Sequence, residues 1–350
     1  MQVSSISFIF ESILVACVLA GVFAWLSIRL ARRTGLLDVP NSAPHKLHKI
    51  PTPLAGGIAL TGSLILSGLA FKTYQDPGVA AAFLACLPVF LFGLLDDYRG
   101  ISPVVKLLGQ SLAVVILIAS GVSVRVLESP EFFIGGNGSV NIYLDWLLTY
   151  FWVVGITNAF NFVDSMDGLA VGLASMATAF FTLVTLNAGQ FDLSRHSALL
   201  LGTCIGLFLF NMPPARLFLG DSGAQTLGTM LAALAIAYRP QDANQSSSWL
   251  VPILLLGVPI FDMILVVFSR LRRKRPVYSA SRDHTYHRLV AFGWNSNHAV
   301  LVMQISSLLL GCLAFLVLTR SPIIANSIFL AVILAGICAF VYFDSHKRWA

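Results

Sequence analysis

The chain has 350 residues, of which 57% are hydrophobic and only 11% are charged, whereas soluble globular proteins carry about 25% charged residues. This composition excludes a soluble globular protein, because most of the surface cannot face water. The formal net charge of +6 would suit a nucleic-acid binder, but in a membrane protein it reflects basic residues at cytoplasmic helix ends, so we expect no nucleic-acid partner.

Long apolar stretches, separated by short polar segments, run along the whole chain. A membrane-spanning helix needs about 20 mostly apolar residues, and eleven stretches qualify as candidates. The predicted helices cover residues 8–29, 54–71, 78–95, 103–121, 143–160, 168–188, 196–212, 222–238, 249–269, 298–319 and 322–343. We therefore predict an all-α fold, a polytopic membrane helical bundle of about 11 transmembrane helices that forms one domain over residues 1–350.

Basic residues are distributed unevenly between the two sets of loops that alternate along this helix pattern. One set and its helix ends hold only five of the 22 Lys and Arg residues, namely Lys72, Arg125, Arg195, Arg239 and Arg320. Loops with the excess of Lys and Arg are expected to be cytoplasmic. The sequence thus predicts an N-terminus outside and a C-terminus inside.

One predicted external segment, residues 123–145, differs from the apolar stretches around it. It combines alternating stretches at 124–127 and 132–134 with the glycine-rich run 135–138. Alternation interrupted by turn residues is typical of a β-hairpin, so we expect a short hairpin here.

The most unusual polar residues lie on the predicted cytoplasmic side, near helix ends. Asp96 and Asp97 follow an apolar run, and Lys106 lies in the fourth predicted helix. Other candidates close the fifth helix, open the eighth or follow the ninth, namely Asn161, Asp164, Asp167, Asp221, His284 and His287. Each has a structural explanation when taken alone, and an aspartate that opens a helix, such as Asp221, can be an N-cap.

Taken together, these residues indicate a functional site. Carboxylate, Lys and His side chains are costly at membrane depth and by default mark such sites. Carboxylates from several helix ends suit Mg²⁺, which binds one or two of them and completes its shell with substrate phosphates, while Lys and His would complement a pyrophosphate. The residue types predict metal-assisted phosphoryl chemistry at a membrane surface, with Mg²⁺, or Mn²⁺ in its place, as cofactor.

A secondary transporter is the competing interpretation. Its acidic residues would cluster near the middle of the membrane, in broken helices and inverted repeats. Asp262 lies well inside the ninth predicted helix and fits that pattern, although it can equally support the site or make a polar contact between helices. Because the other acidic residues lie at helix ends and no repeat is evident, the sequence favours an enzyme.

Five segments of the chain carry recognisable motifs. They are LLDVPNSAPHKLHKIPTPLAGGI (36–58), FGLLDDYRGISPVVKLLGQ (92–110), ITNAFNFVDSMDGLAVGL (156–173), FNMPPARLFLGDSG (210–223) and the His segment 281–289. In this order they resemble the polyprenyl-phosphate N-acetylhexosamine-1-phosphate transferases, glycosyltransferase family 4. The sequence departs from that family at Ser165, where many relatives have Gly, and at Tyr286, where many have a third His.

The resemblance implies a reaction. N-acetylhexosamine-1-phosphate, by default GlcNAc-1-phosphate, would move from a UDP-sugar to undecaprenyl (polyprenyl) phosphate, releasing UMP and starting a cell-envelope polysaccharide. The active site would lie on the cytoplasmic face of the cell inner (plasma) membrane. Direct attack and a covalent aspartyl-phosphate route both fit the sequence. Related folds can pair through apolar helix faces, so a homodimer is compatible with it.

The resemblance also implies roles for individual residues. Asp96 and Asp97 match paired aspartates that serve the acceptor phosphate, and Asp97 is the first candidate for the group beside it. Asp221 matches an Mg²⁺-binding aspartate, and Asp164 is a second candidate ligand. The residues matched to substrate binding are Lys106, Asn161, Asp164, Asp167, His284 and His287, with Lys46 and His48 in the loosely aligned first loop.

Overall fold

The computed structural model describes residues 2–40, 50–127, 138–240, 250–277 and 283–345. The predicted binding residues Lys46 and His48 lie outside these ranges. Within them, the chain forms helices and one pair of two-residue strands, β1 (Leu37–Asp38) and β2 (Thr52–Pro53), which run antiparallel. The described part of the chain therefore confirms the predicted all-α class.

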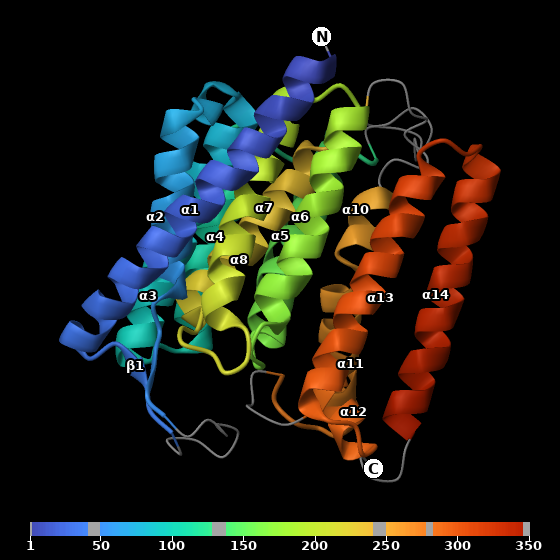
Figure 1. Cartoon of the computed structure of the whole chain (residues 1–350). Coiled ribbons are helices and arrows are strands. Elements are labelled where there is room, and N and C mark those ends of the chain that lie inside the picture. The colour runs from blue at the N-terminus through green and yellow to red at the C-terminus, as the bar shows by residue number, and fades with distance from the viewer. Residues whose placement is uncertain (1, 41–49, 128–137, 241–249, 278–282, 346–350) are drawn as a thin grey trace.

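The helices form a bundle in which the N- and C-terminal ends lie at opposite ends (Figure 1). The first half contains α1 (Gln2–Thr34), α2 (Gly56–Ala70), the 3-10 helix η1 (Thr73–Gln75), α3 (Pro77–Arg99), α4 (Pro103–Ala119), α5 (Gly138–Val163) and α6 (Leu169–Asn187). The second half contains α7 (Phe191–Asn211), α8 (Gly220–Ala237), α10 (Leu250–Leu255), α11 (Gly257–Arg272), α12 (Thr285–Ala291), α13 (Ser296–Val317) and α14 (Pro322–Ser345).

Each predicted helical range overlaps a helix, but the range 249–269 is divided into α10 and α11. The interruption falls at Leu256, three residues before Pro259. A proline has no N–H to donate, and its ring clashes with the carbonyl four residues earlier. Pro259 thus explains why one continuous α-helix does not form across this range.

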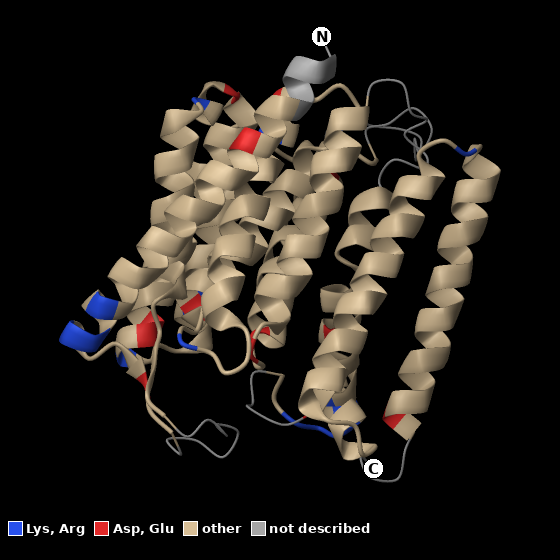
Figure 2. Cartoon of the chain, in the orientation of Figure 1, with Lys and Arg blue, Asp and Glu red and all other residues tan. Residues whose placement is uncertain are grey.

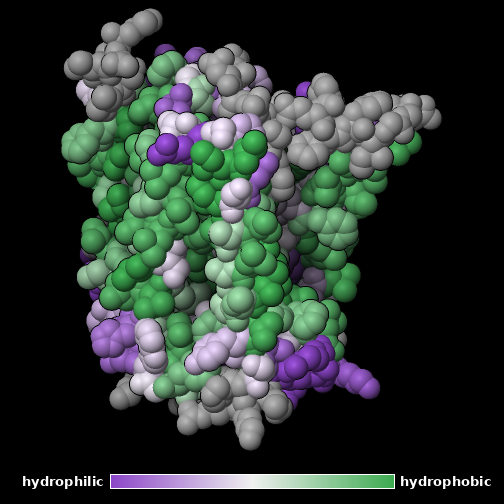
Figure 3. Space-filling view, turned by 90° about the vertical axis from the view of Figure 1, so that its right-hand side faces the viewer, coloured by the Kyte–Doolittle hydropathy of each residue, from purple (hydrophilic) through white to green (hydrophobic). Residues whose placement is uncertain are grey.

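The surface of the bundle is that of a membrane protein. Among the described helices, seven are long and apolar enough to cross a membrane (α1, α3, α5, α6, α7, α13 and α14), and α2 and α4 are shorter apolar helices. Charged residues gather near the two ends of the bundle (Figure 2), and a broad apolar band covers the surface between them (Figure 3). Because lipid leaves no polar partner for an exposed backbone, helices are the spanning structures that fit this surface. The chain is a multi-pass membrane protein.

The predicted external hairpin is absent from the described part of residues 123–145. Residues 124–127 form no strand, and α5 begins at Gly138, while the candidate stretch 132–134 lies outside the described residues. The backbone N–H groups of Val126 and Leu127 donate to the Asp145 carboxylate, at 3.2 and 3.0 Å, instead of to a partner strand. A buried carboxylate on α5 therefore satisfies the amides that a hairpin would have paired.

Helix α8 forms the centre of the bundle. Every residue from Ser222 to Ile236 is buried, and α8 packs against α2, α3 and α5. A helix that is apolar or small on all sides is expected in such a position. On α3, a Cβ added at Gly93 would lie 2.6 Å from the Ser222 Cα and 2.7 Å from its backbone nitrogen. The absence of a side chain at Gly93 allows α3 to approach the start of α8.

Gly93→Ala should destabilise the fold because the new methyl group would meet the backbone of α8, which cannot rotate away. We expect a loss of about 1–3 kcal/mol, as for other overpacked sites. Gly336→Ala on α14 is the matched control, because a Cβ there has no atom within 4 Å. Thermal unfolding of the purified variants checks this, and equal melting temperatures for both would contradict the packing.

Candidate active site at the start of α8

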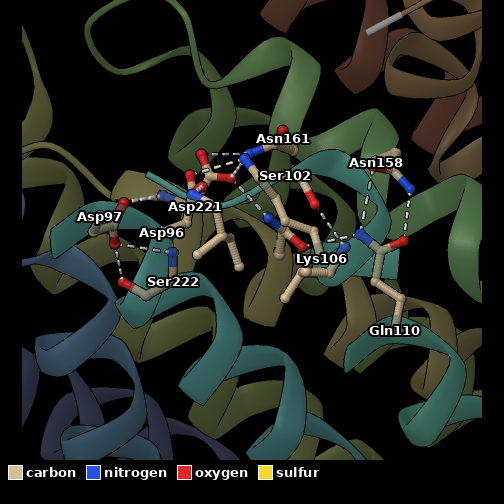
Figure 4. A network of polar contacts seen from close by, with 12 residues as sticks. Asp96, Asp97, Ser102, Lys106, Gln110, Asn158, Asn161, Asp221 and Ser222 are labelled. Atoms are coloured by element: carbon tan, nitrogen blue, oxygen red, sulfur yellow. Dashed lines mark hydrogen bonds and ion pairs between the residues drawn. The ribbon is translucent and has the colours of Figure 1, made fainter. Parts of the chain in front are cut away.

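The first turn of α8 is held by a carboxylate from another helix. Asp97, near the end of α3, accepts hydrogen bonds from the backbone N–H of Asp221 (2.7 Å), and from the N–H and hydroxyl of Ser222 (3.0 and 2.6 Å). Leu219, which precedes α8, provides no side-chain cap. Asp97 therefore acts as the N-cap of α8, and Figure 4 shows its carboxylate directed at Ser222.

Gly220 makes this cap sterically feasible. Its φ is +69°, in the left-handed region that favours glycine. A Cβ at this position would lie 2.6 Å from a carboxylate oxygen of Asp97. The predicted helix-opening motif GDSG thus encodes both the turn and the room for the Asp97 carboxylate.

Lys106, in the first turn of α4, links the other two aspartates of this region. Its Nζ lies 2.8 Å from Asp96 Oδ2 and 2.5 Å from Asp221 Oδ2. The second oxygen of Asp96 accepts from the backbone N–H of Ile101 at 2.8 Å. All three charged side chains are partly exposed, between 15% and 24%, so they can be reached from outside the bundle.

Asn161, Asp164 and Asp167, which are spaced three residues apart, have different surroundings. Asn161 Nδ2 donates to Asp221 Oδ1 at 3.2 Å, whereas Asp167 accepts from the backbone N–H of Ala215 at 2.9 Å and so fixes the loop before α8. Asp164 lies just beyond the end of α5, and its carboxylate has no hydrogen bond or ion pair with another described residue. The segment thus leaves one carboxylate available to a ligand.

The Asp164 carboxyl lies in an unfavourable electrostatic environment for an anion. Burial, and then the negative charges of Asp221 and Asp97, raise its pKa well above the usual range of an aspartate. A cation beside Asp164 would oppose both effects. The site therefore has an excess of negative charge that Lys106 alone does not neutralise.

Three amide side chains extend the site into the bundle (Figure 4). Gln225, one turn after Asp221, donates to Asp221 Oδ2 at 2.9 Å. Gln110 donates to Gln225 Oε1 at 2.9 Å and accepts from Asn158 Nδ2 at 2.9 Å. Gln225 was not predicted as a site residue, although a Gln four residues after Asp221, in a helix of apolar and small residues, was a visible signal.

The histidine segment lies beside the turn that carries Asp164. His284 Nδ1 is 2.9 Å from Asp262 Oδ2, and the other oxygen of Asp262 accepts from the backbone N–H of Thr285 at 2.6 Å. His287 Nε2 is 2.9 Å from the Tyr286 hydroxyl, which in turn lies 3.5 Å from the Ser165 carbonyl oxygen. Asp262 is therefore a polar contact between α11 and the start of α12, as one of the two interpretations from sequence expected.

A buried ionic network that was not predicted from the sequence fixes α12 to α11 and α14. Arg288 is fully buried; its guanidinium donates to Ser269 Oγ at 2.8 Å and lies 3.5 Å from Asp344 at the end of α14. Arg270 forms a two-pronged pair with Asp283 at 3.0 and 2.9 Å. The network holds the histidine segment against α11 and the end of α14.

The cap predicts different stabilities for two Asp97 variants. Asp97→Ala should lose about 0.5–2 kcal/mol, the usual cost of removing an N-cap. Asp97→Asn should lose only part of this, because its single amide oxygen can accept from Asp221 or from Ser222 but cannot replace both oxygens of Asp97. Thermal unfolding of both purified variants measures the difference. Equal losses for Ala and Asn would contradict a capping role.

Asp164→Asn should raise the melting temperature of the metal-free protein at neutral pH. Because the folded-state pKa of Asp164 is raised, its contribution to stability is present at low pH and is lost as the pH rises through that pKa. The variant, which cannot ionise, should lose less stability than the wild type between acidic and neutral pH. Melting curves in EDTA at several pH values test this, and parallel pH profiles would contradict it.

Comparisons with known proteins identify the family. The profile of glycosyl transferase family 4 matches residues 79–239. This range includes Asp96, Asp97, Asp164, Asp167 and Asp221. The decaprenyl-phosphate N-acetylglucosaminephosphotransferase of Mycobacterium tuberculosis (strain H37Rv) is 32% identical over 79% of this chain and 74% of its own length.

Two further relatives extend over similar lengths. The probable undecaprenyl-phosphate N-acetylglucosaminyl 1-phosphate transferase of Bacillus subtilis (strain 168) is 29% identical over 87% of this chain and 83% of its own length. The undecaprenyl-phosphate alpha-N-acetylglucosaminyl 1-phosphate transferase of Escherichia coli (strain K12) is 26% identical over 84% and 80%. The chain is thus a member of the polyprenyl-phosphate N-acetylglucosamine-1-phosphate transferases of glycosyl transferase family 4.

Proposed function

We propose that this enzyme transfers GlcNAc-1-phosphate from UDP-GlcNAc to undecaprenyl (polyprenyl) phosphate and releases UMP, the first step of a cell-envelope polysaccharide. The names of the relatives support the lipid acceptor and the sugar phosphate. The observation that carries the proposal is the convergence of Asp96, Asp221 and Lys106 from three helices at one end of the bundle. A cation and a basic side chain at such a place suit two phosphate-bearing substrates.

We propose further that eleven membrane passes orient this site toward the cytoplasm of the inner membrane. The passes are α1 to α8, the broken pair α10 and α11, α13 and α14. With the N-terminus outside, the excess of Lys and Arg falls on the end of the bundle that carries the aspartates, as the positive-inside rule requires of a cytoplasmic face. The sugar nucleotide would thus meet the site from the cytoplasm.

Mg²⁺, or Mn²⁺, is the proposed cofactor. The described residues contain no group of three or more His, Cys, Asp or Glu side chains able to hold a metal, which argues against a closed protein cage. Mg²⁺ fits nevertheless, because it is usually held by one or two carboxylates together with substrate phosphates. Asp221 and Asp164, which has no partner among the described residues, would hold it. When bound it would neutralise the diphosphate and stabilise charge on the departing UMP.

The proposed roles of Asp96 and Asp97 differ because their surroundings differ. Both oxygens of Asp97 are bonded to the first turn of α8, so Asp97 serves the reaction by holding Asp221. Asp96 is paired with Lys106 at the partly exposed edge of the site, and it replaces Asp97 as our first candidate for the group beside the acceptor phosphate. A strong base is not needed, since a phosphomonoester with a second pKa of about 6 is largely ionised at neutral pH.

The reaction exchanges one pyrophosphate bond for another. A phosphate oxygen of the lipid attacks the β-phosphorus of the UDP-sugar, the bond to the bridging oxygen breaks, and UMP leaves. Lys106 would compensate the charge of the two anions as they meet. Asn161, Asp167, His284 and His287 remain candidates for substrate binding. A covalent route through an aspartyl-phosphate predicts a burst of UMP without acceptor lipid, whereas direct attack predicts none.

Asp262, the residue that best fitted a transporter, has a structural role. Asp262 is fully buried and bonded to His284 and to the first turn of α12, so it holds an element in place and lines no described path. Together with family membership, this contact favours an enzyme.

To test the proposal, the purified protein is incubated with undecaprenyl phosphate and each of a panel of UDP-sugars. The release of UMP and the formation of the lipid product are measured. We expect turnover with UDP-GlcNAc that requires both Mg²⁺ and the lipid, and a loss of at least about 100-fold in Asp221→Asn, the scale of losing an electrostatic group of the site. Asp192→Asn, an exposed aspartate in a surface pair with Arg195, is the matched control. Continuous UMP turnover in the absence of lipid, beyond a single burst, or wild-type turnover in Asp221→Asn, would contradict the proposal.

A further inference from the structure

A chain of three amide side chains runs from the bundle interior to Asp221. It begins at Asn158 on α5, passes through Gln110 on α4 and ends at Gln225 on α8. Figure 4 labels Asn158 and Gln110. Gln110 and Gln225 are each only 2% exposed. A buried amide is costly unless its donor and acceptor are both satisfied, and here the amides satisfy one another.

The direction of this chain is determined by its end at Asp221. An ionised carboxylate only accepts hydrogen bonds, so Gln225 must turn its NH₂ group toward Asp221 and its oxygen toward Gln110. Gln110 must then donate to Gln225, which leaves its own oxygen for the NH₂ group of Asn158. Asn158 also donates to the Val154 carbonyl oxygen at 2.7 Å, which anchors the chain to the backbone of α5.

Because the chain ends at Oδ2 of Asp221, the two oxygens of this carboxylate have different surroundings. Oδ2 accepts from both Lys106 Nζ and Gln225 Nε2, at 2.5 and 2.9 Å. Among the described residues, Oδ1 accepts only the longer bond from Asn161, at 3.2 Å. The neutral amides therefore fix one oxygen of Asp221 without adding charge, and they leave Oδ1 as the oxygen with free acceptor capacity.

Simple cohesion between helices is the alternative role for these amides. The same helices provide a comparison, because Thr157 on α5 and Thr229 on α8 share a buried hydrogen bond of 2.9 Å. Thr229 lies one turn beyond Gln225 on α8, and the pair has no hydrogen bond to Asp221. It joins α5 to α8 as Gln110 and Gln225 join α4 to α8, but away from the carboxylate.

We propose that Gln225 and, through it, Gln110 are positioning residues that orient Asp221 so that Oδ1 is presented to the divalent cation. The inference rests on the proposed function, since it assigns a purpose to the cation site of that function. Groups that hold a metal ligand in place commonly change metal affinity by about 10–100-fold when they are removed.

The experiment measures Mn²⁺ binding by electron paramagnetic resonance in the presence of saturating UMP, so that no turnover is involved. Gln225→Met and Gln110→Met keep an unbranched side chain of similar length without the amide. We expect Mn²⁺ affinity to fall about 10–100-fold in Gln225→Met, to fall less in Gln110→Met, and to stay at the wild-type value in Thr229→Val.

A double variant and melting temperatures complete the design. If Gln110 acts only through Gln225, Gln110→Met should cause no further loss of Mn²⁺ affinity in the Gln225→Met background. Should Gln225→Met fail to fold, Gln110→Met carries the test alone. A purely cohesive role predicts lower melting temperatures with unchanged Mn²⁺ affinity, and that result would overturn the inference. Absence of Mn²⁺ binding to the wild type would instead overturn the proposed cation site itself.

Discussion

The structure depends on how four aspartates are accommodated at one end of a membrane bundle. Carboxylates repel one another strongly where water is scarce. Asp97 is stabilised by the amides of the first turn of α8, and Asp96 and Asp221 share the ammonium group of Lys106. Asp164 has no such partner among the described residues. Four carboxylates therefore face a single ammonium group, which is the physical reason for expecting a divalent cation.

The same contacts connect the chemistry to the fold. Helix α8 is buried along most of its length, and its start is defined by α3 through Gly93 and Asp97. Asp221 lies in that first turn, so the position of its carboxylate is only as well defined as the position of the turn. Metal and substrate groups need positions accurate to within about 0.5 Å. A cap from a neighbouring helix, backed by a chain of buried amides that add no charge, is a rigid way to meet that need.

Much of this architecture could be predicted from sequence, because a membrane restricts the choices. Apolar stretches of sufficient length must become helices, and every predicted range overlaps one. The site residues could be found because acidic side chains are rare at membrane depth, and Asp96, Asp221 and Lys106 are indeed in contact. The helix break at Leu256 was not predicted, although Pro259 was a visible signal for it.

Side-chain directions could not be predicted. Asp96 and Asp97 are adjacent, so on a helix they point about 100° apart, and the sequence does not reveal which one faces α8. The resemblance favoured Asp97 for the acceptor side, whereas its carboxylate faces the backbone of α8. Contacts between distant segments, such as Gln110 with Gln225 or Arg288 with Asp344, likewise depend on how helices are rotated and packed.

The most direct test of the account is to locate the cation. Crystals of the enzyme soaked with Mn²⁺ and UMP would reveal the ion by its anomalous scattering. The account predicts an anomalous peak in contact with Asp221, on the side of Oδ1 and close to Asp164. A peak bound instead by His284 or His287, with none at Asp221, would contradict it.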